Sequence, residues 1–130
     1  MPATYHINPD EGLITVQIDG DVDLVDVFET ARDLRDDTAY EPTLPLLADL
    51  RGMRVKLNAA ALKPFNRFII SHFGRPRSTS IAVVVDEDMD KELCAAVYWL
   101  NCSINAAEMF DDYDLALKWL IRKEFAAAAQ

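Results

Sequence analysis

The sequence predicts an α/β domain with a mixed, mainly parallel sheet of about five strands and four helices, in the order β-β-α-β-α-β-α-β-α. Stretches 44–50 and 80–86 are apolar without alternation, which is typical of strands buried on both faces of a parallel sheet. Amphipathic stretches separate these runs, and such alternation of strands and helices indicates a sheet covered by helices. The 130 residues fit a single domain spanning 1–130.

The chain is expected to open with a hairpin. A short strand at Tyr5–Asn8 is followed by Pro9–Gly12, a cluster of turn-forming residues. Leu13–Asp19 then alternates apolar and polar side chains, which predicts a strand with one buried face. These two strands with a tight turn between them are typical of an antiparallel pair.

The first helix is expected to begin after Gly20, with Asp21 or Asp23 as its cap, and to end near Asp37. Apolar residues recur at helical spacing along this stretch and predict its buried stripe: Leu24, Val25, Phe28, Ala31 and Leu34.

A second helix is predicted within 58–73, and Gly74 should end it. Because proline is tolerated in the first turn of a helix and costs about 3 kcal/mol in its interior, Pro64 leaves two alternatives. The helix is kinked at Pro64, or a short turn precedes a helix that begins near it.

After the second apolar run, a third helix is expected from about Asp88 to Ile104, followed by a short strand at Glu108–Phe110. Asp111 is predicted to cap the last helix, whose expected buried stripe is Leu115, Ala116, Trp119 and Leu120. Phe110 and Leu115 have the spacing of a hydrophobic staple. The tail Ala126–Gln130 is expected to fray.

Composition argues against several classes of protein. A net charge of −9 disfavours nucleic acid as a partner. Cys94 and Cys102 lie about 12 Å apart along one predicted helix, too far for a disulfide, and no zinc ligand set is present. There is no transmembrane-length apolar run and no signal peptide, so we expect a cytoplasmic protein without metal or cofactor; peripheral contact with a membrane is left open.

Several strings, in this order and spacing, resemble the STAS family, the sulfate-transporter and anti-sigma-factor-antagonist domains. They are Gly20–Asp23 before the first helix, Leu47–Gly52 at the end of the central strand, Ile81–Val85 in the next strand and Met109–Leu120 at the end. The resemblance spans about Tyr5 to Leu120 and is closest to the small bacterial branch that is grouped with CRAL-TRIO lipid-transfer domains. It implies a non-enzymatic binding domain.

In the anti-sigma-factor antagonists the central strand ends in Asp-Ser-x-Gly, and phosphorylation of that serine releases a partner. Asp49 and Gly52 match the aspartate and the glycine of this pattern, whereas Leu50 stands at the position of the serine. Leucine has no hydroxyl group, and no Ser, Thr or Tyr occurs from Leu50 to Leu57. The resemblance therefore implies the geometry of a switch site without its phosphoserine.

Two further features suggest a binding site. From Leu50 to Val85 there is no acidic residue, and this window holds seven of the thirteen basic residues, which form one patch or two. Aromatic residues also exceed what one helical stripe can bury. The predicted ligand-binding residues are Asp49, Arg51, Arg54, Phe65, Phe68, Tyr98 and Trp99.

The ligand hypothesis favours a small apolar or lipid-like molecule with an anionic head near the arginines. Surface charge and ordinary core packing are the alternatives. A second hypothesis is a protein-interaction module that acts as a homodimer.

A catalytic site is not expected, and a hydrolase that uses Ser71, His72 or Ser78 is only a distant third hypothesis. Ser71 and His72 are neighbours in a predicted helix, so their side chains diverge, and Ser78 lies outside any nucleophile-elbow motif. The sequence contains no Walker loop and no dinucleotide-binding glycine pattern. The aspartates near positions 19 and 86 fail the calcium-loop pattern.

Overall fold

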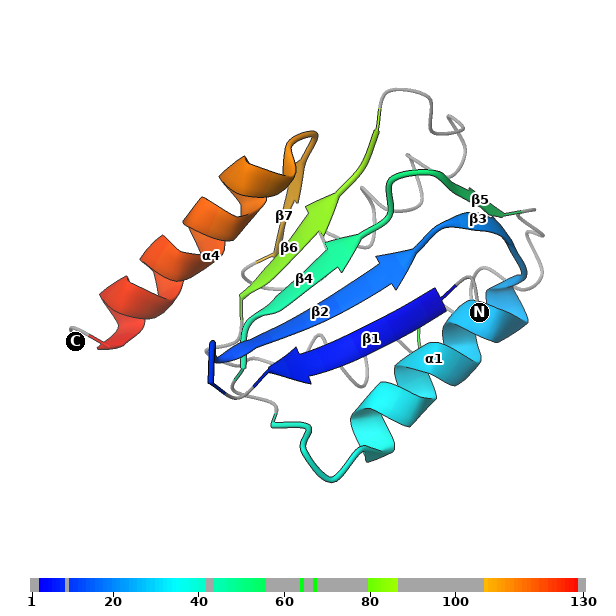
Figure 1. The fold of residues 1–130 in the computed structure, drawn as a ribbon, viewed down its shortest axis with the longest axis horizontal. Helices are drawn as coiled ribbons and strands as arrows, with labels where there is room; N and C mark the ends of the chain where they lie inside the picture. Colours follow the sequence, from blue (N-terminus) through cyan, green and yellow to red (C-terminus); the bar gives the residue numbers. More distant parts are fainter. Residues whose placement is uncertain are drawn as a thin grey trace.

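A computed structural model of the chain describes residues 3–8, 10–41, 44–55, 64, 67, 80–86 and 107–128. Figure 1 shows its helices and strands. In chain order they are β1 (Ala3–Asn8), β2 (Leu13–Ile18), β3 (Gly20–Val22), α1 (Leu24–Asp36), β4 (Leu46–Asp49), β5 (Met53–Val55), β6 (Ile81–Val84), β7 (Ala107–Phe110) and α4 (Tyr113–Ala128).

The main sheet has five strands in the order β1-β2-β4-β6-β7. The hairpin strands β1 and β2 are antiparallel, whereas β2, β4, β6 and β7 run parallel to one another. This confirms the predicted mixed, mainly parallel sheet of five strands. The carboxyl ends of its four parallel strands lie at one edge of the sheet.

Two of the four predicted helices are described. Helix α1 lies beside β1, and α4 lies beside β6 and β7 at the other end of the sheet (Figure 1). The other two predicted helices, 58–73 and 88–104, lie outside the described residues, except that Pro64 and Arg67 have helical backbone.

A second, two-stranded sheet of β3 and β5 was not predicted. Gly20 and Gly52 both have positive φ, +78° and +79°, where β2 and β4 lead into these short strands. The amide of Gly20 donates to the carbonyl of Gly52 at 3.0 Å, and β3 then pairs with β5 in parallel. Glycine permits this backbone turn because it has no Cβ to clash in the left-handed region.

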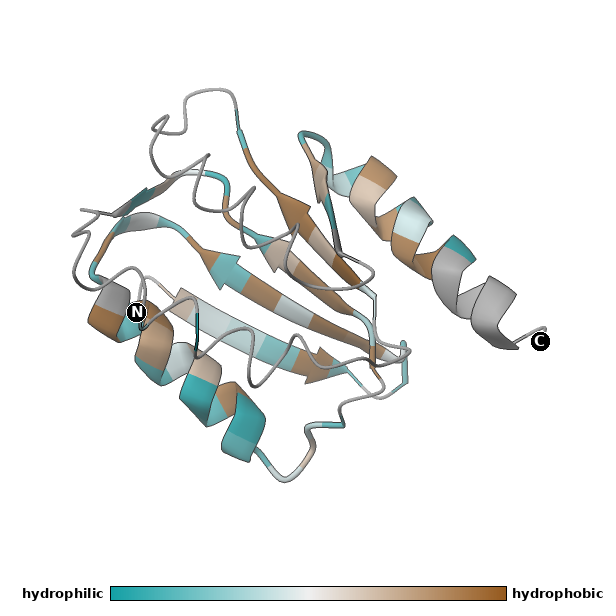
Figure 2. Cartoon of the chain, turned by 180° about the vertical axis from the view of Figure 1, so that it is seen from behind, coloured by the Kyte–Doolittle hydropathy of each residue, from teal (hydrophilic) through white to brown (hydrophobic). Residues whose placement is uncertain are grey.

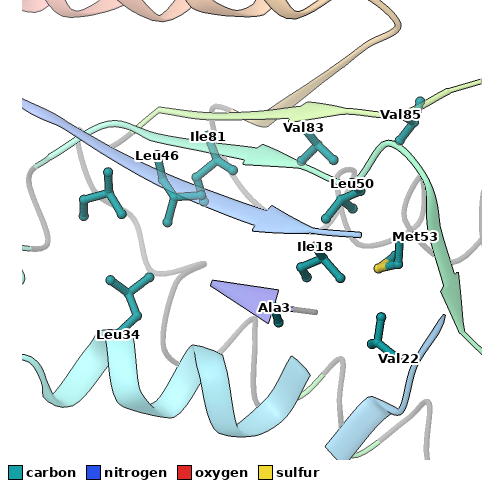
Figure 3. Close-up of a cluster of buried hydrophobic side chains, with 11 residues drawn as sticks. Ala3, Ile18, Val22, Leu34, Leu46, Leu50, Met53, Ile81, Val83 and Val85 are labelled. Atoms are coloured by element: carbon teal, nitrogen blue, oxygen red, sulfur yellow. The ribbon is translucent and has the colours of Figure 1, made fainter. Parts of the chain in front are cut away.

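Apolar side chains from the central strands fill both faces of the sheet. On one face, Ile14, Leu46 and Ile81 pack with Leu34 of α1, which Figure 3 shows pointing from the helix toward the strands. On the other face, a second buried group packs beneath α4: Leu47, Ala82, Val84, Ala116 and Leu120. Figure 2 shows hydrophobic residues along the central strands, in contrast to the hydrophilic end of α1. Burial on both faces explains why β4 and β6 lack alternation.

Two residues predicted to be buried are exposed. Val25 precedes the buried Leu34 by nine residues, which places it on the opposite side of α1. Leu115 precedes the buried Leu120 by five residues, about 140° around α4. Each predicted stripe was therefore too wide.

The predicted cap of α4 was one residue early. The carboxylate of Asp112, and not that of Asp111, accepts the amide of Leu115 at 3.0 Å. The carbonyl of Asp112 also accepts the amide of Ala116. With the cap at Asp112, Phe110 and Leu115 no longer have the staple spacing. Phe110 instead packs on Trp119, with ring centroids 5.6 Å apart.

Within the described residues, no helix is long and apolar enough to cross a membrane.

Candidate functional site

The candidate site lies at the carboxyl end of β4, in the middle of the sheet edge where the parallel strands end. Such edges are where open α/β sheets usually place ligands. The chain bends from β4 into β5 through Leu50–Met53, which we call the Arg51 turn. The amide of Met53 donates to the carbonyl of Leu50 at 3.1 Å, and Gly52 has φ +79°. A positive φ at the third residue of a β-turn is characteristic of type II turns.

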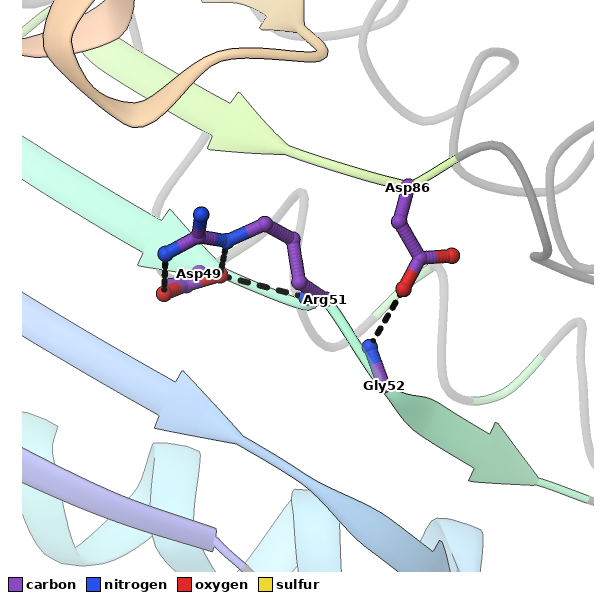
Figure 4. Close-up of polar contacts among 4 residues, drawn as sticks. All are labelled: Asp49, Arg51, Gly52 and Asp86. Atoms are coloured by element: carbon purple, nitrogen blue, oxygen red, sulfur yellow. Dashed lines mark hydrogen bonds and ion pairs between the residues drawn. The ribbon is translucent and has the colours of Figure 1, made fainter.

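Asp49 and Arg51 form the main ion pair of the site (Figure 4). Nε of Arg51 donates to Oδ1 of Asp49 at 2.9 Å, and Nη2 donates to Oδ2 at 2.9 Å. Oδ1 also accepts the amide of Arg51 at 3.2 Å. The Asp49 side chain is 12% exposed and that of Arg51 is 46% exposed. The pair therefore has one buried member and one that reaches solvent.

Tyr113, the first residue of α4, supports the Arg51 guanidinium. The guanidinium carbon lies 5.5 Å from the centroid of the Tyr113 ring, within the range of a cation–π contact. The hydrogen bonds and charge of Asp49 raise the pKa of Arg51, and Tyr113 and Asp112 add smaller contributions. Arg51 thus joins the end of β4 to the start of α4.

The pKa of Asp49 is lowered by the same contact. The hydrogen bond from the Arg51 side chain is the main cause, and it outweighs burial, which acts in the opposite direction. The carboxylate therefore remains ionised at neutral pH and keeps the guanidinium in place.

Gly52 is held from two sides. Its amide donates to Oδ2 of Asp86, at the end of β6, at 2.7 Å (Figure 4). On its other side lies Asp19, whose Oδ1 would be 2.6 Å from a Cβ added to Gly52. Real Cβ atoms do not approach so closely, and the positive φ disfavours other residues as well. The positive φ therefore favours glycine at position 52, and an added Cβ would also displace the carboxylate of Asp19.

Leu50 stands where the STAS resemblance would place a phosphoserine. It is buried, and its amide donates to the carbonyl of Val84 at 2.9 Å. Its apolar side chain belongs to the core beneath the sheet. The position is a packing position that carries no hydroxyl group.

Arg54, another predicted ligand residue, lies on β5 and pairs with Asp21 of β3 at 2.9 Å. Both side chains are exposed, and the Asp21 contact raises the pKa of Arg54. Among the contacts of the described residues, none joins Arg54 to Arg51. Since each guanidinium already has a carboxylate partner, an anionic head group would have to compete with Asp49 or Asp21.

Phe65, Phe68, Tyr98 and Trp99 lie outside the described residues. Their predicted roles in binding an apolar or lipid-like ligand stay predictions, as does the homodimer. Whether the basic window 51–77 forms one patch or two also stays open. The structure describes only three of its seven basic residues, Arg51, Arg54 and Arg67.

Three residues of the site were not predicted: Asp19, Asp86 and Tyr113. Asp19 and Asp86 follow parallel strands, as Arg51 does. Their position after these strands was therefore the sequence feature that could have placed them at the same edge of the sheet as Arg51. Asp86 was considered only near the start of the third predicted helix and in a calcium-loop pattern that it fails. Tyr113 had no comparable signal, because its approach to Arg51 depends on how α4 packs.

The arrangement is suited to binding. The carboxylates of Asp49 and Asp86 are both engaged by donors from the Arg51 turn. In the part of the chain that the structure describes, no group of three or more His, Cys, Asp or Glu residues is placed to hold a metal ion. The Arg51 turn itself presents a fixed, partly exposed guanidinium at the surface.

Comparisons with known proteins agree with this architecture. A model of the family described as SpoIIAA-like matches residues 13–121. An uncharacterised protein of the DUF3478 family from Shewanella loihica PV-4, described as having a SpoIIAA-like fold, has a similar crystal structure with a TM-score of 0.60. The two sequences are 16% identical over 91% of each chain, so the likeness concerns the fold alone. The search of curated proteins found no match.

Proposed function

This chain belongs to the SpoIIAA-like family, and we propose that it is a non-enzymatic binding domain that contacts a partner protein through the Arg51 turn. The observation that carries the proposal is the state of Arg51. Its side chain is nearly half exposed, yet Asp49 and Tyr113 hold it in one position.

A fixed arginine at the surface is well suited to anchor a protein contact. Arginine is among the residues that most often dominate the energy of protein interfaces. A free arginine side chain loses rotamer entropy when a partner immobilises it, and this loss weakens binding. Because the Asp49 pair has already ordered Arg51, less entropy remains to be lost on association.

The proposed contact does not depend on phosphorylation of the turn. Leu50 has no hydroxyl group and is buried in the core, so the position corresponding to the family's phosphoserine cannot be modified in that way. We therefore propose that partner binding is not switched by phosphorylation at position 50.

The test is affinity capture from extracts of cells that naturally make the protein, with quantitative mass spectrometry of the bound proteins. Replacing Arg51 by alanine is expected to reduce recovery of the specific partner on the order of tenfold or more. Arg35→Ala is the matched control, because it removes the same charge and a surface ion pair with Asp36 on α1. It should leave recovery unchanged.

Arg51→Lys keeps the charge but lacks the planar fork that pairs with Asp49, so it is expected to recover only part of the binding. Circular dichroism of each variant checks that the domain remains folded. If folded Arg51→Ala and Arg51→Lys both capture the same proteins as the wild type in equal amounts, Arg51 is not the contact residue.

A further inference from the structure

The two central amides of the Arg51 turn are bound by carboxylates from two different strand ends. Asp49, at the end of β4, accepts the amide of Arg51, and Asp86, after β6, accepts the amide of Gly52 at 2.7 Å. Figure 4 shows Asp86 reaching Gly52 on the side away from the Asp49–Arg51 pair. Asp86, which lies 34 residues after Gly52 in the sequence, thus contacts the turn that presents Arg51.

The hydrogen bond from the Gly52 amide to Asp86 holds the peptide group between Arg51 and Gly52. This is the peptide group that changes orientation between the common types of β-turn. Type I and type II turns differ in the orientation of the peptide between their two central residues, here Arg51 and Gly52. Gly52 is compatible with both orientations, because glycine accepts positive and negative φ. The observed φ of +79° is that of the type II form, in which the Gly52 amide meets Asp86.

The other contacts of Gly52 do not hold that amide. The Asp19 carboxylate lies on the side of Gly52 where a Cβ would stand, and the Gly20 amide binds the carbonyl of Gly52, which belongs to the following peptide. Among the described contacts, only Asp86 binds the amide of the central peptide. Reversal of that peptide would reorient the backbone of Arg51 and strain its two-point pair with Asp49.

We propose that Asp86 is the positioning residue of the candidate binding site: its carboxylate locks the central peptide of the Arg51 turn in the positive-φ form and so sets the direction in which Arg51 is presented. This inference rests on the proposed function for its role in binding, but its structural part is tested separately.

The test uses nuclear magnetic resonance on the full chain and its Asp86→Ala variant. In the observed form, the Arg51 α-proton lies close to the Gly52 amide proton, so a strong Overhauser effect is expected between them. Asp86→Ala should weaken this effect and speed exchange of the Gly52 amide with solvent about ten- to hundredfold, the loss expected for a hydrogen bond to a charged group. Asp86→Asn retains an acceptor oxygen and should restore most of both signals.

Asp37→Ala is the matched control. It removes an aspartate that also accepts a backbone amide, that of Ala39 at 2.9 Å, at the end of α1 and outside the candidate site. It should leave the Gly52 signals as in the wild type. Equal Gly52 exchange in Asp86→Ala and the wild type, with an unchanged Overhauser effect, would overturn the proposal.

The capture assay separates this proposal from the proposed function. Reduced partner recovery with Asp86→Ala, restored by Asp86→Asn, supports positioning. If Arg51→Ala abolishes capture while Asp86→Ala captures as well as the wild type, the positioning role is wrong and the proposed function stands. If the Gly52 signals change as expected but Arg51→Ala captures normally, the turn lock stands and the proposed function is wrong.

Discussion

Asp49 is the residue on which the candidate site depends most. Its carboxylate accepts three hydrogen bonds from Arg51, one from the backbone and two from the guanidinium. Burying a carboxylate without partners would be costly, and the guanidinium offsets that cost. Removing Arg51 would leave the buried carboxylate of Asp49 with that cost, whereas Arg51 reaches solvent whether or not Asp49 is present.

Replacing Asp49 by asparagine is expected to lower the free energy of unfolding at pH 7 by about 1–2 kcal/mol, because a neutral amide binds the guanidinium less strongly. The folded-state pKa of Asp49 is depressed below the ordinary value of about 3.9. Its stabilisation is therefore full above that value and is lost as the pH falls through the folded-state pKa. Urea unfolding between pH 7 and pH 2 should show the difference between wild type and variant shrinking below about pH 4.

Asp36→Asn provides the control for this titration. Asp36 pairs with Arg35 at the surface, and exposed pairs contribute about 0–1 kcal/mol. A difference between wild type and Asp49→Asn that stays constant from pH 7 to pH 2 would contradict the assigned role of the carboxylate.

At the scale of elements, packing decides which face of each helix is buried. Helix α4 sits on β4, β6 and β7 through Ala116 and Leu120, while Leu115 and Ile121 lie on its exposed sides. Asp112 caps its first turn, and Tyr113 places the start of the helix against Arg51. The position of α4 is therefore part of the geometry of the candidate site.

Leu120→Ala is expected to lower the free energy of unfolding by about 2–5 kcal/mol, the range for removing a buried leucine. Leu120 is 1% exposed, and its loss would leave a cavity between α4 and the sheet. The neighbouring Ile121 is 60% exposed, so Ile121→Ala should cost less than about 1 kcal/mol. Denaturant unfolding of both variants measures the contrast, and equal losses would mean that α4 does not pack as described.

At the scale of the whole molecule, the family match confirms the STAS-like resemblance that the strings along the chain suggested. The grouping with CRAL-TRIO domains, the cytoplasmic location and the lack of catalysis stay predictions. The net charge of −9 is unevenly distributed along the chain, since residues 50–85 contain no acid. In space, however, two of the arginines in this window pair with aspartates that precede it in the sequence. Arg51 pairs with Asp49, and Arg54 pairs with Asp21.

Native mass spectrometry of gently purified protein tests the two whole-molecule hypotheses together. An apolar ligand held by the aromatic residues would add a discrete mass that organic extraction removes. A homodimer would double the mass, and the dimer fraction would rise with protein concentration. A spectrum with the bare mass of one chain, unchanged at high concentration and after extraction, would contradict both hypotheses.

Local patterns predicted the strands of the main sheet well, but not β3 and β5. The alternation in Leu13–Asp19 and the unbroken apolar run at 80–86 depend on residues close in sequence, and both correspond to strands at the expected places. The parallel arrangement also followed, because the helical connections between parallel strands cover both faces of a sheet and leave its strands without alternation. Helix faces were less predictable, since Val25 and Leu115 are apolar residues that the packing leaves exposed.

The sequence by itself determined the α/β class, the five-stranded sheet, the loss of a phosphoacceptor at Leu50 and the presence of Asp49, Arg51 and Gly52 at the end of the central strand. The tertiary structure alone decided that Arg51 rests on Tyr113 and that Asp86 reaches the amide of Gly52. The physical reason is distance along the chain. Strand and turn preferences arise within a few residues, whereas Asp86 and Tyr113 reach residues 51–52 because parallel pairing and helix packing align elements 34 or more residues apart.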